Sequence, residues 1–164
     1  MIALGPWAGE LTTTLGYKLP LFVKRGYHRH YRGGPGLRLP MLDAERGLVI
    51  APMAAGMRIT TGAEFARIGA PATPVQLDKA EQAARELIAL PGPVEAEPWL
   101  GNRPCTVDMK PVIGPAPRHS GLWFNFGHSH QGFTLGPVSG RLLAEMIEGA
   151  EPFVDPGPYA STRF

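Results

Sequence analysis

Two pairs of histidines, each separated by one residue, are the first candidates for chemistry in this sequence. They are His28 with His30 and His128 with His130. In an extended segment, residues two apart share a face, so each pair could direct two imidazoles at a metal ion. No third or fourth ligand follows at a suitable spacing, and the single cysteine, Cys105, adds none. We therefore predict no metal site.

A nucleophile is equally hard to assemble from these residues. Cys105 follows Arg103-Pro104, and a nearby cation can lower the pKa of a thiol, but a packed small residue is the simpler interpretation. Ser129 lies between His128 and His130, yet neighbours in sequence do not form a catalytic triad, and no nucleophile-elbow pattern surrounds it. We predict no catalytic side chain.

Arg103 and the loop at residues 127–132 are stronger candidates for binding. Arg103 is followed by a rigid proline and preceded by Gly101-Asn102, a setting that suits bidentate capture of a carboxylate. The loop, Gly127-His-Ser-His-Gln-Gly132, joins an apolar segment to a helical pattern and could aim backbone N–H groups at a ligand. A surface arginine and an ordinary strand-to-helix turn explain the same spacing. The spacing alone does not decide whether Arg103 binds a carboxylate or is a surface residue, nor whether the loop binds a ligand or is an ordinary turn.

The first hundred residues are typical of an antiparallel sheet with one helix. Residues 19–31 are strand-like with an interruption at Gly26, and the glycines at 33–36 predict a turn. Residues 48–51 and 57–61 predict two further short strands of an antiparallel meander. A helix follows, with Thr73 as its N-cap and an apolar face formed by Leu77, Ala80, Ala84, Leu87 and Ile88.

The ends of the chain have a different pattern. Residues 2–4 read as a short buried strand, which suggests that another segment normally precedes it, and residues 7–15 can form a helix. The proline-rich stretch 98–117 predicts a long ordered loop. Residues 122–126 predict a buried strand, and an amphipathic helix runs from about Leu135 to a C-cap at Gly149.

Composition excludes several classes of protein. Among 164 residues, 16 Lys and Arg against 14 Asp and Glu give a net charge of +2, and no basic stripe indicates a nucleic-acid partner. Glycine and proline are abundant, at 21 and 18 residues, but 44% hydrophobic residues favour a folded, turn-rich chain. No apolar run reaches the length of a membrane span. A single cysteine and an N-terminus without a basic signal region predict a cytoplasmic location.

Taken together, the segments resemble the C-terminal half of the D-amino-acid oxidase/dehydrogenase family of FAD-dependent oxidoreductases. The matching pieces occur in the family's order from residue 2 to about residue 149. They are Ile2-Ala-Leu-Gly-Pro-Trp-Ala-Gly-Glu-Leu11, Lys24-Arg-Gly-Tyr-His28, Gly56-Met-Arg-Ile-Thr-Thr-Gly-Ala-Glu-Phe65, Gly101-Asn-Arg-Pro104, Lys110-Pro-Val-Ile-Gly-Pro115 and Phe126-Gly-His-Ser-His-Gln-Gly-Phe-Thr134.

The resemblance implies roles for individual residues. Arg103 matches the arginine that pairs with the substrate carboxylate, Tyr27 an aromatic position near the pocket, and His130 a variable polar pocket position. Cofactor-binding positions match at the strand-end motif and at the loop and helix start around the isoalloxazine ring. These are Gly5, Trp7, Gly127, His128, Gly132, Phe133 and Thr134. In such an arrangement the positive end of the following helix would stabilise the reduced, anionic flavin.

The sequence departs from the family's pattern in three places. Asp108-Met109-Lys110 replaces the usual Asp-Gly-x, and Val107 stands where proline is common. The family's N-terminal strand, its Gly-x-Gly-x-x-Gly turn and the acidic residue for the ribose have no counterpart here. We therefore expect FAD in the complete enzyme but not in the isolated chain.

These observations predict an α+β fold. Residues 17–96 would form an antiparallel β-sheet substrate-binding domain with a covering helix, and residues 1–16 with 97–164 an incomplete C-terminal part of an FAD-binding domain. The predicted reaction is oxidation of the C–N bond of D-amino acids or related amines by hydride transfer to flavin. Expected partners are that small-molecule substrate, a missing N-terminal half or partner subunit, and further copies of the chain. The alternative is a non-catalytic module that kept the fold and lost the cofactor.

Overall fold

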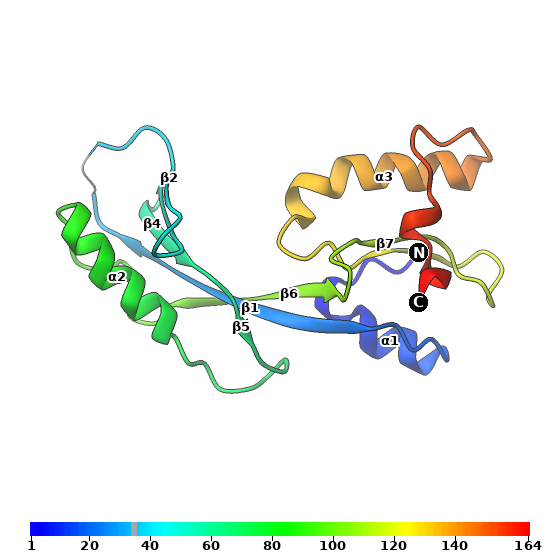
Figure 1. Ribbon diagram of the computed structural model, residues 1–164, viewed down its shortest axis with the longest axis horizontal. Coiled ribbons are helices and arrows are strands. Elements are labelled where there is room, and N and C mark those ends of the chain that lie inside the picture. The colour runs from blue at the N-terminus through cyan, green and yellow to red at the C-terminus, as the bar shows by residue number, and fades with distance from the viewer. Residues whose placement is uncertain (34–35) are drawn as a thin grey trace. The chain divides into compact units, whose positions relative to one another are not determined.

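The computed structural model describes residues 1–33 and 36–164, so part of the predicted turn at 33–36 lies outside the described residues. The described chain forms two compact units (Figure 1). Unit 1 contains residues 1–24 and 102–164, and unit 2 contains residues 25–101. Strands β1 (Leu21–Tyr31) and β6 (Trp99–Thr106) carry the chain from one unit into the other. Unit 2, at 25–101, begins eight residues later and ends five residues later than the predicted domain 17–96.

Unit 2 is built on an antiparallel sheet. The strands follow the order β2-β3-β4-β1-β5, and β6 also pairs with β1. The meander predicted at 48–51 and 57–61 is confirmed, because β3 and β4 pair antiparallel with Ile50 opposite Ile59. The remaining bounds are β2 Met41–Asp43, β3 Leu48–Met53, β4 Gly56–Thr61 and β5 Glu64–Phe65.

One helix, α2 (Val75–Leu87), covers one face of this sheet (Figure 1). Its residues Leu77, Ala80 and Ala84 are buried, as the spacing predicted, and they pack against Ile50 and Ile59 of the sheet. Alternate residues of a strand point to opposite faces, so the apolar residues of β3 and β4 reach this core while their neighbours lie on the other face. The helix and sheet therefore make unit 2 a two-layer structure.

Two local predictions in unit 2 were wrong. Gly26 does not interrupt the strand, because β1 runs without a break and Gly26 is buried inside it. Thr73 does not cap α2: the N-cap is Pro74, with no side-chain cap. The Thr73 hydroxyl instead bonds to the carboxylate of Glu64, a residue distant in sequence that a local capping rule cannot anticipate.

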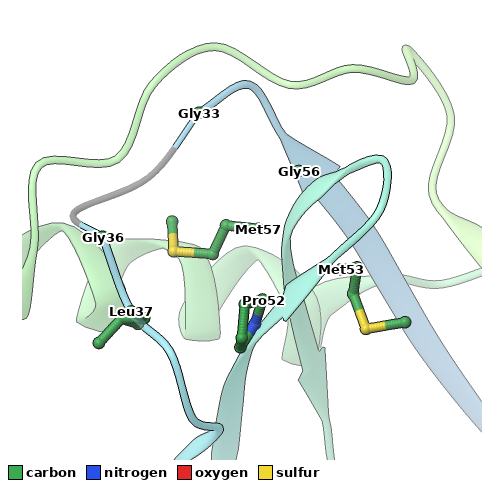
Figure 2. Close-up of a pocket in the computed structure, with 7 residues that line it drawn as sticks. All are labelled: Gly33, Gly36, Leu37, Pro52, Met53, Gly56 and Met57. Atoms are coloured by element: carbon green, nitrogen blue, oxygen red, sulfur yellow. The ribbon is translucent and has the colours of Figure 1, made fainter.

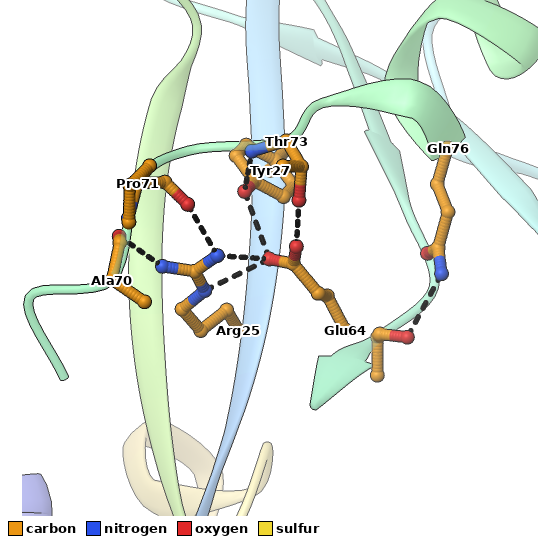
Figure 3. Close-up of polar contacts among 8 residues, drawn as sticks. Arg25, Tyr27, Glu64, Ala70, Pro71, Thr73 and Gln76 are labelled. Carbon is orange, nitrogen blue, oxygen red and sulfur yellow. Dashed lines mark hydrogen bonds and ion pairs between the residues drawn. The ribbon is translucent and has the colours of Figure 1, made fainter. Parts of the chain in front are cut away.

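A buried ion pair fixes the segment between β5 and α2 onto β1. The guanidinium of Arg25 is 1% exposed and donates to Glu64 Oε2 at 2.8 Å, to the Ala70 carbonyl at 2.6 Å and to the Pro71 carbonyl at 2.8 Å (Figure 3). A buried charge needs such partners, since leaving it unpaired costs several kcal/mol, on the order of 3–5. The contacts therefore determine the path of residues 64–73.

Unit 1 contains a small two-stranded sheet, and the N-terminal segment of the chain lies parallel to one of its strands. Strands β7 (Val112–Pro115) and β8 (Trp123–Phe126) pair antiparallel, with Val112 opposite Phe126. Ile2 forms a parallel bridge to Phe124. The predicted strand at 2–4 is thus reduced to one bridging residue, because Ala3 and Leu4 are exposed.

Helices surround this sheet. Helix α1 (Ala8–Thr14) follows the 3₁₀ turn η1 (Gly5–Trp7), close to the predicted helix 7–15. Helix α3 (Gly132–Glu148) packs Leu142 and Leu143 against Ile113 of β7 and ends at Gly149, whose φ of 69° confirms the predicted C-cap. The chain closes with η2 (Gly157–Tyr159) and η3 (Ser161–Arg163).

The stretch 98–117 is not the irregular loop that its prolines predicted. It contains β6 and β7, and three of its prolines lie just before a strand or at its last residue, where a missing N–H is tolerated. Pro98 precedes β6, Pro111 precedes β7, and Pro115 is the last residue of β7. Among residues 1–33 and 36–164, no helix combines the length and apolar character needed to cross a membrane.

Candidate functional site

The backbone of unit 1 brings two separate segments to the same end of its small sheet. The N–H of Ile2 donates to the Trp123 carbonyl at 2.7 Å, and the N–H of Asn125 donates to the Ile2 carbonyl at 2.9 Å. Because these two segments run parallel, both leave the sheet in the same direction. The carboxyl ends of adjacent parallel strands border the crevice where ligands bind in open α/β sheets. Residues 5–7 and 127–131 therefore lie at a suitable edge for a ligand.

Both segments make their turns with a glycine in the left-handed region. Gly5 has a φ of +54°, and a Cβ built there would meet nothing within 4 Å. Gly127 has a φ of +82°, and its Cβ would lie 3.3 Å from Thr106 Cγ2. Gly127 is thus required by its backbone and by its neighbour, whereas Gly5 leaves open space beside the backbone. Trp7, after Gly5, is 53% exposed.

The first turn of α3 presents its backbone N–H groups without a side-chain cap. The helix begins at Gly132, three residues before the predicted start, and its N-cap residue Gln131 makes no side-chain cap hydrogen bond. The first N–H groups of a helix have no partner inside it and carry the positive end of the helix dipole. Residues 130–134 are all exposed, and Phe133 is 100% exposed. This end of α3 is open to an electron-rich ligand.

Gly132 does not have the role in this turn that its sequence position suggested. The sequence predicts a strand, a tight glycine loop and a helix start at 126–135, with glycines at 127 and 132 where a Cβ would be obstructed. At Gly132, however, the nearest atom to such a Cβ is His128 Cβ at 3.5 Å, an ordinary contact. The strand, glycine loop and helix start predicted for 126–135 are otherwise confirmed.

His128 is held in one orientation by the helix that follows. Its Nε2 lies 3.1 Å from Ser139 Oγ, and the Ser139 hydroxyl donates to the Gly136 carbonyl at 3.1 Å. The serine hydrogen is thereby used, so His128 Nε2 carries a hydrogen and donates to Ser139. Burial lowers the pKa of His128, which favours the neutral ring. Sequence reasoning missed Ser139, whose only signal was its place in the second turn of the predicted helix.

Arg103 belongs to the strand that lies against this loop. The N–H of Ser129 donates to the Pro104 carbonyl at 2.8 Å, and Cys105 forms an antiparallel bridge with His128. Arg103 is half-buried and lies two residues before the bridged Cys105. The structure thus brings Arg103, His128 and His130 into one neighbourhood of unit 1, although nothing in their spacing required it.

Cys105 and Ser129, the thiol and the hydroxyl near Arg103, are both buried by packing. Cys105 is completely buried, and its Sγ lies 3.6 Å from the Arg103 carbonyl. Ser129 is buried, with a φ of 54°, and its Oγ lies 3.8 Å from Met109 Sδ. Met109 has a φ of 60°, a left-handed conformation that glycine adopts most easily, and glycine is the usual residue of the family at this position. Neither Cys105 nor Ser129 contacts a base in the described contacts.

Tyr27 lies in unit 2, where its hydroxyl already has two partners. The ring is 2% exposed, the hydroxyl donates to Glu64 Oε2 at 2.9 Å, and it accepts from the Thr73 N–H at 2.8 Å (Figure 3). These contacts make Tyr27 part of the network around Arg25. A substrate contact at Tyr27 stays a prediction.

Two cavities are lined by none of the predicted site residues. One, of about 260 Å³, is lined in unit 2 by glycine, leucine, proline and methionine, with no polar side chain (Figure 2). The other, of about 170 Å³, lies in unit 1 between α3 and residues 153–159, and Ser139 borders it. Within the part of the chain that the structure describes, no three His, Cys, Asp or Glu residues gather into a metal site.

Comparison with known proteins places this geometry in a family. The family described as FAD dependent oxidoreductase (DAO) matches residues 1–146. Glycine oxidase of Pseudomonas aeruginosa is 36% identical over 98% of this chain and 44% of its own length. D-amino acid dehydrogenase of Cereibacter sphaeroides is 31% identical over 100% of this chain and 38% of its own length. The chain therefore spans less than half the length of these two relatives.

The fold agrees with the same family. The crystal structure of glycine oxidase from Geobacillus kaustophilus superimposes with a TM-score of 0.81, at 24% identity, over 98% of this chain and 44% of that chain. At this identity the superposition supports the fold alone, an antiparallel sheet with few helices, as predicted. With the match over residues 1–146, this chain belongs to the FAD-dependent oxidoreductase (DAO) family.

Proposed function

We propose that this chain is the C-terminal portion of an FAD-dependent oxidoreductase that oxidises the C–N bond of D-amino acids or related amines. The observation that carries the proposal is the convergence at one end of the unit 1 sheet. The Gly5 turn, the uncapped start of α3 and the strand that carries Arg103 all meet there. A ring with electron-rich edges and a carboxylate can both be accommodated at such a place.

The residues present fit the isoalloxazine part of FAD. The open space beside Gly5 admits a flat ring close to the backbone, and Gly127 keeps the loop tight where a side chain would not fit. The positive end of α3 suits the carbonyl side of a flavin that becomes anionic on reduction. In the proposed site Gly5, Trp7, Gly127, His128, Gly132, Phe133 and Thr134 border the cofactor. When bound, FAD supplies the hydride-accepting chemistry.

Arg103 would hold the substrate carboxylate, and His130, exposed at the same loop, would border the substrate. A planar guanidinium forms two parallel hydrogen bonds with a carboxylate, which fixes the α-carbon in one orientation. Loss of one hydride, which carries two electrons, from the α-carbon of the neutral amine leaves a protonated imine, so no side-chain base is required once the amine is unprotonated. The chain's contribution is then orientation and electrostatics.

The ADP part of FAD would be bound outside this chain. The matched length of less than half of the relatives is consistent with a separate segment or subunit that supplies the dinucleotide-binding turn. We propose a cytoplasmic setting, since the one cysteine is buried and unpaired.

The visible flavin absorbance of the purified protein tests this proposal. The 164-residue chain is expressed with and without its upstream coding region, and both preparations are assayed with D-amino acids and with glycine. We expect bound FAD and amine oxidation only in the longer preparation. A longer preparation that is folded, lacks flavin and does not take up added FAD would support the non-catalytic module instead.

A further inference from the structure

The face of the unit 2 sheet opposite α2 carries an arginine held by a chain of hydrogen bonds. In the pairing of β1 with β4, His30 lies opposite Arg58 and His28 lies opposite Thr60. Their neighbours Tyr31 and Ile59 belong to the core under α2, so these four residues share the other face.

Arg58 is oriented through His30 and Glu95. Arg58 Nε donates to His30 Nε2 at 3.0 Å, so that nitrogen is an acceptor and the ring hydrogen is on Nδ1. His30 Nδ1 then donates to Glu95 Oε1 at 2.7 Å, and the His30 backbone N–H donates to Glu95 Oε2 at 3.0 Å. Both oxygens of Glu95 are thus engaged by His30, which is itself only 7% exposed.

This arrangement leaves the positive charge of Arg58 without a carboxylate of its own. Among the ion pairs of the described residues, Arg25, Arg29 and Arg46 each meet an acid in unit 2, and Arg58 does not. Its hydrogen bond to His30 uses Nε, so the two terminal amino groups of the fork are directed away from that contact. A half-buried guanidinium fixed in this manner is ready for a bidentate anion.

His28 and Trp99 form a wall beside Arg58. The His28 ring stacks on the Trp99 ring with centroids 4.6 Å apart and planes 24° apart, and it meets the His30 ring edge-on at 5.2 Å. Trp99 is 58% exposed, so the stack has a solvent-accessible side. Burial and the nearby Arg58 and His30 lower the pKa of His28 to about 4, against the opposing effect of Glu95. At neutral pH the ring is therefore uncharged and keeps one N–H to donate.

We infer that this face of unit 2 binds a carboxylate-bearing small molecule, with the Arg58 fork as anchor, His28 as a second donor and Trp99 as the flat wall. The inference rests on unit 2 alone and goes beyond the proposed flavin chemistry. It can therefore fail or hold independently of FAD binding.

Anion titrations of the 164-residue chain, followed by NMR of the histidine and tryptophan side chains at constant ionic strength and pH 7, test this inference. Acetate is the carboxylate probe, and inorganic phosphate and chloride are the comparison anions. We expect acetate to shift the His28 and Trp99 signals saturably, and chloride to leave them unchanged. Saturable shifts with phosphate and none with acetate would overturn the carboxylate assignment.

Three variants separate the specific site from general charge effects. Arg58→Lys keeps the charge but loses the fork, and it should weaken acetate binding about three- to tenfold. His28→Phe keeps a ring that can stack on Trp99 and removes the donor, with a smaller expected loss that is followed at Trp99. Arg38→Gln, at an exposed arginine of the same unit, is the charge control and should bind as the parent does. Unchanged acetate binding in both Arg58→Lys and His28→Phe, or an equal loss in Arg38→Gln, would overturn the inference.

Discussion

The N–H of Ser129 donates to the carbonyl of Pro104 at 2.8 Å, and this bond joins the strand of Arg103 to the loop that begins at Gly127. The two segments are far apart in sequence, and each is ambiguous alone. Their pairing supports one binding region in unit 1, with a guanidinium on one strand and helix N–H groups on the next element. We therefore propose that Arg103 binds the substrate carboxylate while the loop and the start of α3 border the flavin.

Arg103→Lys should reduce catalysis in the FAD-loaded, assembled enzyme. Lysine keeps the charge but cannot form two parallel hydrogen bonds with a carboxylate, so kcat/KM should fall by about 2–3 kcal/mol in transition-state stabilisation. Steady-state kinetics with a D-amino acid measures the change. Arg141→Lys, at an exposed arginine that pairs with Glu145 on α3, is the matched control. Unchanged kcat/KM in Arg103→Lys would remove Arg103 from the substrate site.

Gly127→Ala and Gly132→Ala should differ in stability. Gly127 has a φ of +82° and a close neighbour in Thr106, so an alanine there should destabilise the chain by about 1–2 kcal/mol. Gly132 is the first residue of α3, and it has neither a positive φ nor a close contact. Alanine is more favourable than glycine in a helix by up to about 1 kcal/mol, so Gly132→Ala should not destabilise the chain. Urea unfolding compares the variants. Equal destabilisation by both substitutions would contradict the described geometry of the loop.

Several features of the fold were predictable from the sequence because they depend on neighbouring residues. The alternation in β3 and β4, the three- and four-residue spacing in α2 and the glycine after α3 are local signals. The strand β6 was missed because Pro98 and Pro104 indicate a loop to any local rule. What makes β6 a strand is its pairing with β1 and the bridge from Cys105 to His128, and both are long-range contacts.

The site was predictable only in part for the same reason. Arg103 and the 127–132 loop could be selected by residue type, but their adjacency depends on that bridge. Tyr27 is a different case, since the resemblance implied a position near the pocket, and the structure shows its hydroxyl bonded to Glu64 and to the Thr73 N–H. A hydroxyl's partners depend on which distant segment folds over it, and no spacing in the sequence carries that information.

Asp108→Asn should weaken the attachment of the C-terminal segment in a pH-dependent manner. Asp108 accepts from Arg163 Nε at 2.8 Å and Nη2 at 3.2 Å, and this guanidinium contact holds the pKa of Asp108 well below its ordinary value of 3.8. The ionised carboxylate therefore stabilises the fold fully above about pH 4. That contribution is lost as the pH falls from there through the lowered pKa of the folded state.

The expected cost of Asp108→Asn at pH 7 is about 1–2 kcal/mol, which is below the roughly 1.5–3 kcal/mol of a fully buried hydrogen bond to a charged group because Asp108 is partly exposed. Urea unfolding at pH 7 and near pH 3 gives the difference between parent and variant at each pH. We expect that difference to shrink in acid. Asp155→Asn, where an amide oxygen can still accept from the Gly157 N–H, is the control and should change little at either pH. A difference that grows in acid would have the wrong sign for this ion pair.

We expect the purified chain to self-associate, and the structure indicates that the N-terminal segment provides the contact surface. The strands predicted at 2–4 and 122–126 would expose edges and apolar faces if a covering half were missing, but Phe124 and Phe126 are buried against Ile2 and its neighbours. Beside the bridge at Ile2, exposed apolar side chains remain on the N-terminal segment, where Met1 is 70% and Leu4 46% exposed.

The same segment also offers an unpaired edge. In a parallel bridge the N–H and carbonyl of Ile2 face β8, so those of Ala3 face away, and such an edge with apolar side chains recruits other chains. Sedimentation velocity over a range of concentrations should show a colourless dimer or larger species. Leu4→Lys should shift it toward monomer, whereas Leu39→Lys, at a leucine in unit 2 that is 76% exposed, should not. A yellow monomer with stoichiometric FAD would contradict both the expected self-association and the expectation that the isolated chain does not hold FAD.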